Sequence, residues 1–122
     1  MTYEKSSWQD AEERVRDLAR RLAKMPGRKS CTEAENWLYA EQDLIARGDK
    51  SVRLLRGIRR AFLAALNIEG SKVTPTTTIP STHAKALSIF ARIIAEEISI
   101  DAFFAVQPGT ADELFYSLMV FV

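Results

Sequence analysis

The sequence contains one cysteine, Cys31, and one histidine, His83. A single cysteine excludes an internal disulfide and zinc sites built from paired cysteines, and a single histidine excludes metal sites with several imidazole ligands. Neither residue has a catalytic partner at a useful spacing in the sequence. We therefore expect Cys31 to be an ordinary thiol near a helix cap and His83 to be an exposed or capping side chain. The sequence indicates no enzyme activity, no metal and no cofactor.

The chain also lacks a long apolar run and a large net charge. No stretch approaches the roughly 18 apolar residues that cross a membrane. The polar residues 1–17 do not have the apolar run of a signal peptide, so we expect a cytoplasmic protein without membrane contact. The formal net charge is +1, so no global attraction draws the chain to nucleic acid.

Apolar residues recur at helical spacing in five segments, and no segment indicates a convincing strand. The expected helices cover residues 7–25, 31–49, 51–68, 82–98 and 111–122. The predicted fold class is therefore all-α. A short loop with Pro26 and Gly27 joins the first two helices, which predicts an antiparallel helical hairpin over residues 1–49. Residues 50–122 are then expected to form a helical bundle on which this hairpin packs.

Two residue pairs have the spacing of a capping box at a helix start. They are Thr32 with Glu35 and Thr110 with Glu113. Gly48 is expected to end the second helix.

Two residues stand out within the helices. Gly57 lies inside the third helix, where glycine costs about 1 kcal/mol against alanine, so we expect it to mark a close packing contact. Glu41 lies on an otherwise apolar helix face, and we expect it to pair with an arginine of the first helix.

From about residue 52 onward, four stretches follow one another in a familiar order. They are "IRRAFLAALNI", "SKVTPTTTI", "HAKALSIFARIIAEEISI" and "GTADELFYSL". This order resembles the helices and long first loop of an acyl carrier protein or peptidyl carrier domain over residues 52–122. The resemblance implies a carrier-like helical bundle.

Carrier domains hold phosphopantetheine on the serine of an Asp-Ser-Leu sequence at the start of the second helix. The resemblance places His83, Ala84 and Lys85 at this tripeptide, and alanine has no hydroxyl to modify. Ser81 and Ser88 lie nearby but out of register. Modification of Ser81 or Ser88 therefore stays an alternative to a carrier-like domain that has lost its attachment serine.

The second helix is also the surface that the partners of carrier proteins contact. The resemblance implies partner contacts here at His83, Lys85, Ser88 and Arg92. Lys85 and Arg92 replace the acidic side chains usual in the family, which favours an acidic protein partner. The apolar stretch "FYSLMVFV" over residues 115–122 offers a surface for homo-oligomers. The leading hypothesis is a non-catalytic protein-interaction module.

A basic cluster between Lys50 and Arg60 supports a different hypothesis, a small nucleic-acid-binding protein. Arg53, Arg56 and Arg60 share one helix face, which suits phosphate binding. However, no aromatic residues interleave with them and no helix-turn-helix pattern is present. Residues 96–122 carry acidic side chains and no basic one, so pairing of the basic and acidic faces is the simpler explanation. We expect Glu96 and Glu97 themselves to lie at a solvated helix end.

The first hairpin has a second resemblance, over residues 8–48. The stretch "PGRKSCTEAENWLYAEQDL" is similar to a family of short, uncharacterised bacterial helical proteins. The matching residues are Pro26, Gly27, Trp37, Leu38, Ala40 and Glu41. This resemblance implies a helical hairpin and no particular activity.

Overall fold

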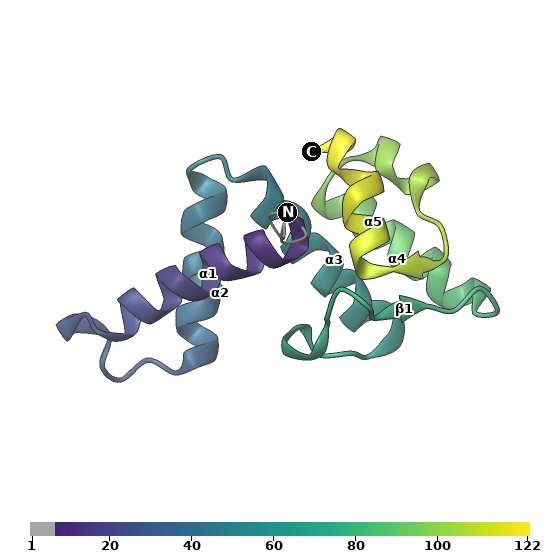
Figure 1. The fold of residues 1–122 in the computed structure, drawn as a ribbon. Coiled ribbons are helices and arrows are strands. Elements are labelled where there is room, and N and C mark those ends of the chain that lie inside the picture. The colour runs from purple at the N-terminus through teal and green to yellow at the C-terminus, as the bar shows by residue number, and fades with distance from the viewer. Residues whose placement is uncertain (1–6) are drawn as a thin grey trace, which may run out of the picture.

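The computed structural model describes residues 7–122 and consists mainly of helices (Figure 1). The α-helices are α1 (Ser7–Ala23), α2 (Glu33–Ala46), α3 (Lys50–Leu66), α4 (Ala84–Glu97) and α5 (Ala111–Leu118). Short 3₁₀ helices lie at Pro26–Arg28, Gly70–Lys72, Ile100–Ala105 and Met119–Phe121. The prediction of an all-α fold is confirmed. Among the described residues, no helix has both the length and the apolar character that crossing a membrane requires.

Two very short strands, β1 (Thr78–Ile79) and β2 (Gly109–Thr110), pair in antiparallel orientation. The sequence did not indicate them because each has only two residues. Ile79 is buried, and Thr78 lies opposite Thr110 in the register. The pairing therefore ties the long segment after α3 to the start of α5.

The helix boundaries follow the local sequence signals. The side chains of Thr32 and Thr110 each accept a hydrogen bond from a backbone N–H three residues on, at 3.1 Å in both cases, which confirms the two capping boxes. Gly48 has a φ of +90°, the left-handed conformation that glycine adopts easily at the end of a helix. The loop between α2 and α3 is therefore tight.

Asp49 caps α3 and also contacts α1, which the sequence analysis missed. Its carboxylate accepts a hydrogen bond from the backbone N–H of Val52 at 3.1 Å. The guanidinium of Arg14 donates two further hydrogen bonds to it, at 2.8 and 3.0 Å. Aspartate is among the preferred N-cap residues, so this part of its role was visible in the sequence.

Helix α3 lies between the hairpin of α1 and α2 and the remaining helices (Figure 1). In the ribbon view α1 crosses α2 obliquely. The ring of Phe62 on α3 contacts Phe90 on α4 edge to face, with 5.0 Å between centroids. Trp8 on α1 is fully buried and contacts Phe115 on α5 at 5.8 Å. The helices before and after residue 49 therefore share one hydrophobic core.

Gly57 lies at a close packing contact between α3 and the end of α4, as the sequence suggested. A Cβ atom at this position would lie 3.3 Å from Cβ of Glu97 and 3.3 Å from Cδ1 of Ile98. These distances are shorter than ordinary van der Waals contacts. The missing side chain lets the two helix backbones pack closely.

Replacing Gly57 with valine should push α3 and α4 apart. We expect Gly57→Val to lower the free energy of unfolding by about 1–3 kcal/mol, the usual cost of overpacking a core. Chemical denaturation would measure it, with Ala64→Val as the control because Ala64 is exposed on the same helix. Equal stability of the two variants would contradict the packing role of Gly57.

Candidate functional site

The residues that the sequence assigned to partner binding lie together on α4. Lys85, Ser88 and Arg92 are all exposed, and their spacing places them on one side of the helix. His83 precedes them at the N-cap position, is exposed, and makes no capping hydrogen bond with its side chain. This α4 face therefore presents two basic side chains that form no ion pair with the described residues.

The two candidate serines are also accessible. Ser81 lies in the turn before α4, and Ser88 lies in the second turn of the helix; both are exposed. Ala84 is the first residue of α4 and is exposed as well. The position that the carrier resemblance assigns to the modified serine is thus at a helix start but lacks a hydroxyl.

The three arginines of the nucleic-acid hypothesis point toward the C-terminal end of α4. Arg53 donates a hydrogen bond from Nη2 to the carbonyl of Ile98 at 3.2 Å. Nη1 of Arg60 lies 2.7 Å from Oε1 of Glu97, and Nη2 of Arg56 lies 3.7 Å from Oε2. The expected pairing of basic and acidic side chains is confirmed for Glu97, the acidic residue of 96–122 that Arg56 and Arg60 contact. These arginines fasten α3 to α4.

The environment of Glu97 differs from the expectation of a solvated helix end. Glu96 is exposed, as predicted, but the side chain of Glu97 is only 17% exposed. That prediction is wrong for Glu97 because α3 covers this side of α4 and places two guanidinium groups against it. Adjacent helix positions point in different directions, so one glutamate is paired while the other is hydrated.

Glu41 on α2 is the centre of a buried polar cluster. Only 3% of Glu41 is exposed, and its Oε2 accepts a hydrogen bond from Nε1 of Trp37 at 3.0 Å. The same oxygen lies 3.5 Å from Nη1 of Arg59, which belongs to α3. The expectation of a partner on the first helix is therefore wrong, because the side of α2 that carries Glu41 faces α3.

Arg59 connects three parts of the chain. Its guanidinium lies over the ring of Trp37 on α2, 4.5 Å from the centroid. Its Nε donates a hydrogen bond to the carbonyl oxygen of Gly70 at 2.9 Å, in the segment after α3. Arg59 belongs to the basic cluster of the sequence. The sequence analysis selected Arg53, Arg56 and Arg60 instead, because those three share one helix face.

Burial sets the direction of both pKa shifts in this pair. It raises the pKa of Glu41, against the hydrogen bond from Trp37 and the positive charge of Arg59. It also lowers the pKa of Arg59, against the negative charge of Glu41. For each group, the cost of losing hydration outweighs the attraction to its charged partner, which is the usual balance of a buried ion pair.

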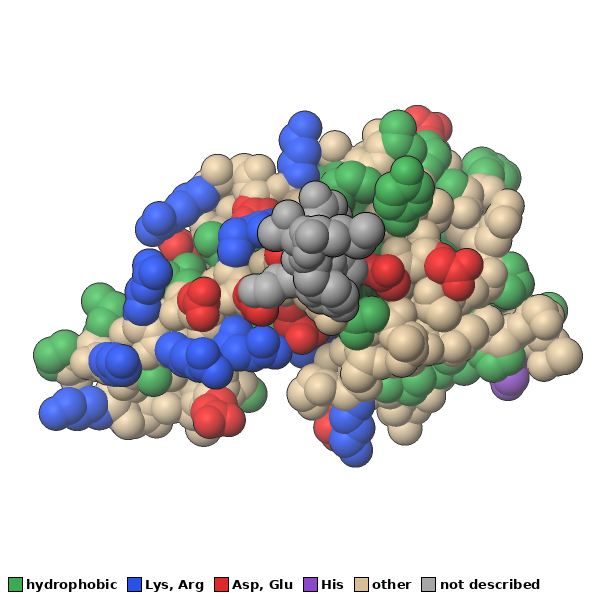
Figure 2. Space-filling model, in the orientation of Figure 1, with side chains coloured by type: hydrophobic (Ala, Val, Ile, Leu, Met, Phe, Trp, Pro, Cys, Tyr) green, Lys and Arg blue, Asp and Glu red, His purple; other side chains and the backbone are tan. Residues whose placement is uncertain are grey.

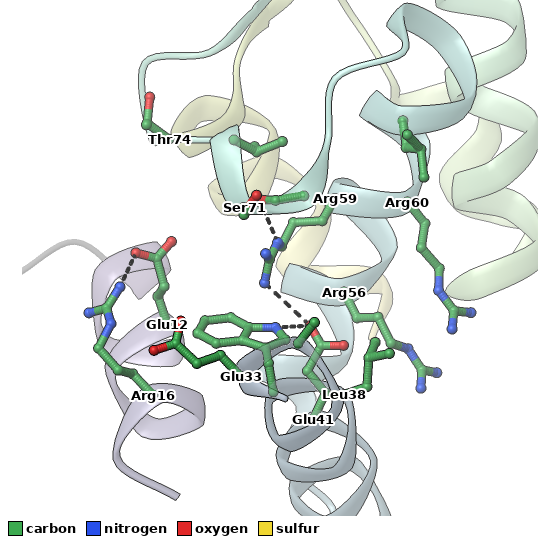
Figure 3. Close-up of a pocket in the computed structure, with 15 residues that line it drawn as sticks. Glu12, Arg16, Glu33, Leu38, Glu41, Arg56, Arg59, Arg60, Ser71 and Thr74 are labelled. Atoms are coloured by element: carbon green, nitrogen blue, oxygen red, sulfur yellow. Dashed lines mark hydrogen bonds and ion pairs between the residues drawn. The ribbon is translucent and has the colours of Figure 1, made fainter. Parts of the chain in front are cut away.

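A pocket of about 640 Å³ opens beside this cluster (Figure 3). Its wall is built by α1, α2, α3 and the segment after α3. The lining residues are Glu12, Arg16, Glu33, Ala34, Trp37, Leu38, Glu41, Arg56, Arg59, Arg60, Leu63, Gly70, Ser71, Val73 and Thr74. Arg56 and Arg60 point to the same side in the close-up, past Leu38. The sequence analysis did not foresee this pocket, because its wall forms only when the hairpin packs on α3.

The C-terminal apolar stretch is only partly available for self-association. Phe115 and Leu118 are buried in the molecule's own core. Tyr116 and Val120 are exposed, at 86% and 80%. No cluster of three or more metal-ligating side chains occurs in residues 7–122, and Cys31 is a free, partly buried thiol.

The stability of the protein should report the protonation of Glu41. Because its pKa is raised from 4.5, the folded state binds this proton more tightly than the unfolded chain. The contribution of Glu41 to the free energy of unfolding is therefore largest below pH 4.5 and falls as the pH rises above it. We expect the stability difference, wild type minus Glu41→Gln, to fall over that range in urea unfolding at several pH values.

Asp49 provides a control, because its pKa shifts in the direction opposite to that of Glu41. Burial acts to raise its pKa, but hydrogen bonds from Arg14 and the backbone outweigh burial and lower the pKa from 3.8. Its stabilising contribution is present above pH 3.8 and is lost as the pH falls through the folded value. The difference between wild type and Asp49→Asn should therefore rise with pH. A Glu41→Gln difference that also rises would contradict the burial argument.

Comparison of the chain with protein-family models, with curated proteins and with solved structures gives no match.

Proposed function

We propose that the protein is a non-catalytic protein-interaction module, and that the α4 face formed by His83, Lys85, Ser88 and Arg92 binds an acidic partner. The proposal rests on two basic residues of this face that are exposed and form no ion pair. Lys85 and Arg92 are exposed and have no ion-pair partner in residues 7–122, whereas the arginines of α3 are engaged within the protein. Unpaired charges on one helix face are available to steer and select a partner.

The carrier-like interpretation of residues 52–122 belongs to this proposal. The order of elements, a long helix, a long loop, a second helix, a short helical turn and a last helix, is compatible with it. In this interpretation Ala84 occupies the place of the attachment serine, so the domain would be recognised through its surface alone. Tyr116 and Val120 would supply any contact between two copies of the chain.

Photo-crosslinking from position 88 tests the α4 face. With benzoylphenylalanine in place of Ser88, we expect an adduct whose crosslinked partner peptide is acidic. The double variant Lys85→Glu, Arg92→Glu should reduce the adduct yield about tenfold, because reversed charges repel an acidic surface. The control Lys24→Glu, Lys29→Glu changes the net charge equally on the hairpin, where both lysines are exposed. Equal yields from the two variants would rule out the α4 face.

An intact-mass measurement separates this proposal from a working carrier. Both Ser81 and Ser88 are exposed, so a phosphopantetheinyl transferase could reach them. We expect no mass increase after incubation with coenzyme A and a promiscuous transferase. A gain of one phosphopantetheine that disappears in Ser81→Ala or Ser88→Ala would show that the protein is a carrier.

A further inference from the structure

The pocket between the hairpin and α3 has the dimensions of a small-molecule site. Its volume of about 640 Å³ lies within the roughly 300–1,000 Å³ typical of ligand pockets. It opens where α2, α3 and the 70–74 segment meet, and Figure 3 shows side chains from each of them around it. It lies apart from the α4 face, because its wall includes no residue of α4. An inference about it is therefore independent of the proposed partner surface.

One end of the pocket is rich in hydrogen-bond donors. Arg56, Arg59 and Arg60 are among the residues that line it. Arg59 gives one hydrogen bond to Gly70 and Arg60 gives one to Glu97, although each guanidinium has five N–H donors. Nε of Arg56 and Nη1 of Arg59 are buried and have no hydrogen-bond acceptor among the described residues.

Glu97 of α4, which lies outside the wall, is 2.7 Å from Arg60 and 3.7 Å from Arg56, so it meets part of this demand. Glu12 at the far end binds Arg16 at 3.0 Å. Glu41 accepts its hydrogen bond from Trp37 and is 3.5 Å from Arg59, outside good hydrogen-bond distance. On the face shown in Figure 2, basic side chains gather over the hairpin, with acidic side chains among them. The donor-rich end is therefore suited to an anion.

Apolar side chains lie beside the arginines. Leu38 and Leu63 line the pocket and are 53% and 47% exposed. Trp37 and the buried Val73 complete this part of the wall. Apolar surface next to a cluster of donors is typical of sites that bind an organic body with a charged head group.

We propose that this pocket binds a small organic anion. Its carboxylate or phosphate group contacts Arg56 and Arg60, which point to the same side in Figure 3, and its apolar body lies against Leu38 and Leu63. Arginine forms paired hydrogen bonds with both kinds of head group, so the site chemistry is the same for either. The leucines distinguish this ligand from inorganic phosphate.

Fluorescence of anilinonaphthalene sulfonate, an aromatic anion, tests the proposal on the full chain. We expect saturable binding that Arg60→Gln weakens about tenfold, because a charge-assisted hydrogen bond is lost. Arg60 is half exposed, so the variant should fold, which its thermal melting would check. Arg92→Gln is the matched control, since Arg92 is exposed on α4 outside the pocket. Equal weakening by both variants, or by neither, would overturn the proposal.

Competition and apolar variants define the ligand class. Phenyl phosphate or phenylacetate should displace the probe at lower concentration than benzyl alcohol or inorganic phosphate, because only the first two carry both parts. Whichever displaces better identifies the preferred head group. Leu63→Ser should weaken binding and Tyr116→Ser should not. Loss of binding only in Tyr116→Ser would place the probe on the C-terminal apolar surface and overturn the proposal.

Discussion

The contact between Glu41 and Arg59 places the hairpin on the rest of the molecule. It joins α2 to α3, and through the carbonyl of Gly70 it also fixes the segment after α3. A buried ion pair contributes little net stability, since dehydration offsets the attraction, but losing one partner leaves an uncompensated charge. Its role is therefore best understood as specifying how α2 lies against α3. Both residues, and others of α2 and α3, line the pocket between the two helices.

The arginines of α3 show how a basic cluster can hold two helices together. Arg53, Arg56 and Arg60 bind the C-terminal end of α4, and Gly57 between them lets the two helices approach. The same arginines would form a phosphate-binding face if α3 were isolated. In the folded chain Glu97 offsets part of their charge, so the structure gives no particular support to nucleic-acid binding. Arg56 and Arg60 also line the pocket between the hairpin and α3, whereas Arg53 does not.

The α4 face and the pocket are proposed to bind through different interactions. The α4 face is open and carries unpaired charges, which suits a protein partner recognised largely by electrostatics. The pocket is concave and combines guanidinium groups with half-exposed leucines, which suits a small amphipathic anion. Helix α4 does not contribute to the pocket wall. Substitutions at Lys85 or Arg92 therefore test partner binding, and a substitution at Arg60 tests ligand binding in the pocket.

The sequence alone determined the features that depend on neighbours along the chain. Helical periodicity located the five α-helices, and the Thr32 and Thr110 capping boxes and Gly48 depend on residues within one helical turn. Local spacing was sufficient for each of these predictions.

Only the tertiary structure decided which charges meet. Glu41 was recognised as unusual, but its partner depended on which helix covers that side of α2, and the chosen helix was wrong. Likewise, Glu96 and Glu97 are indistinguishable in sequence, and only the approach of α3 buries one of them. The pocket and the two-residue strands join segments far apart in the chain. Their residues carry no local pattern, because burial and pairing between distant segments arise only when the helices pack.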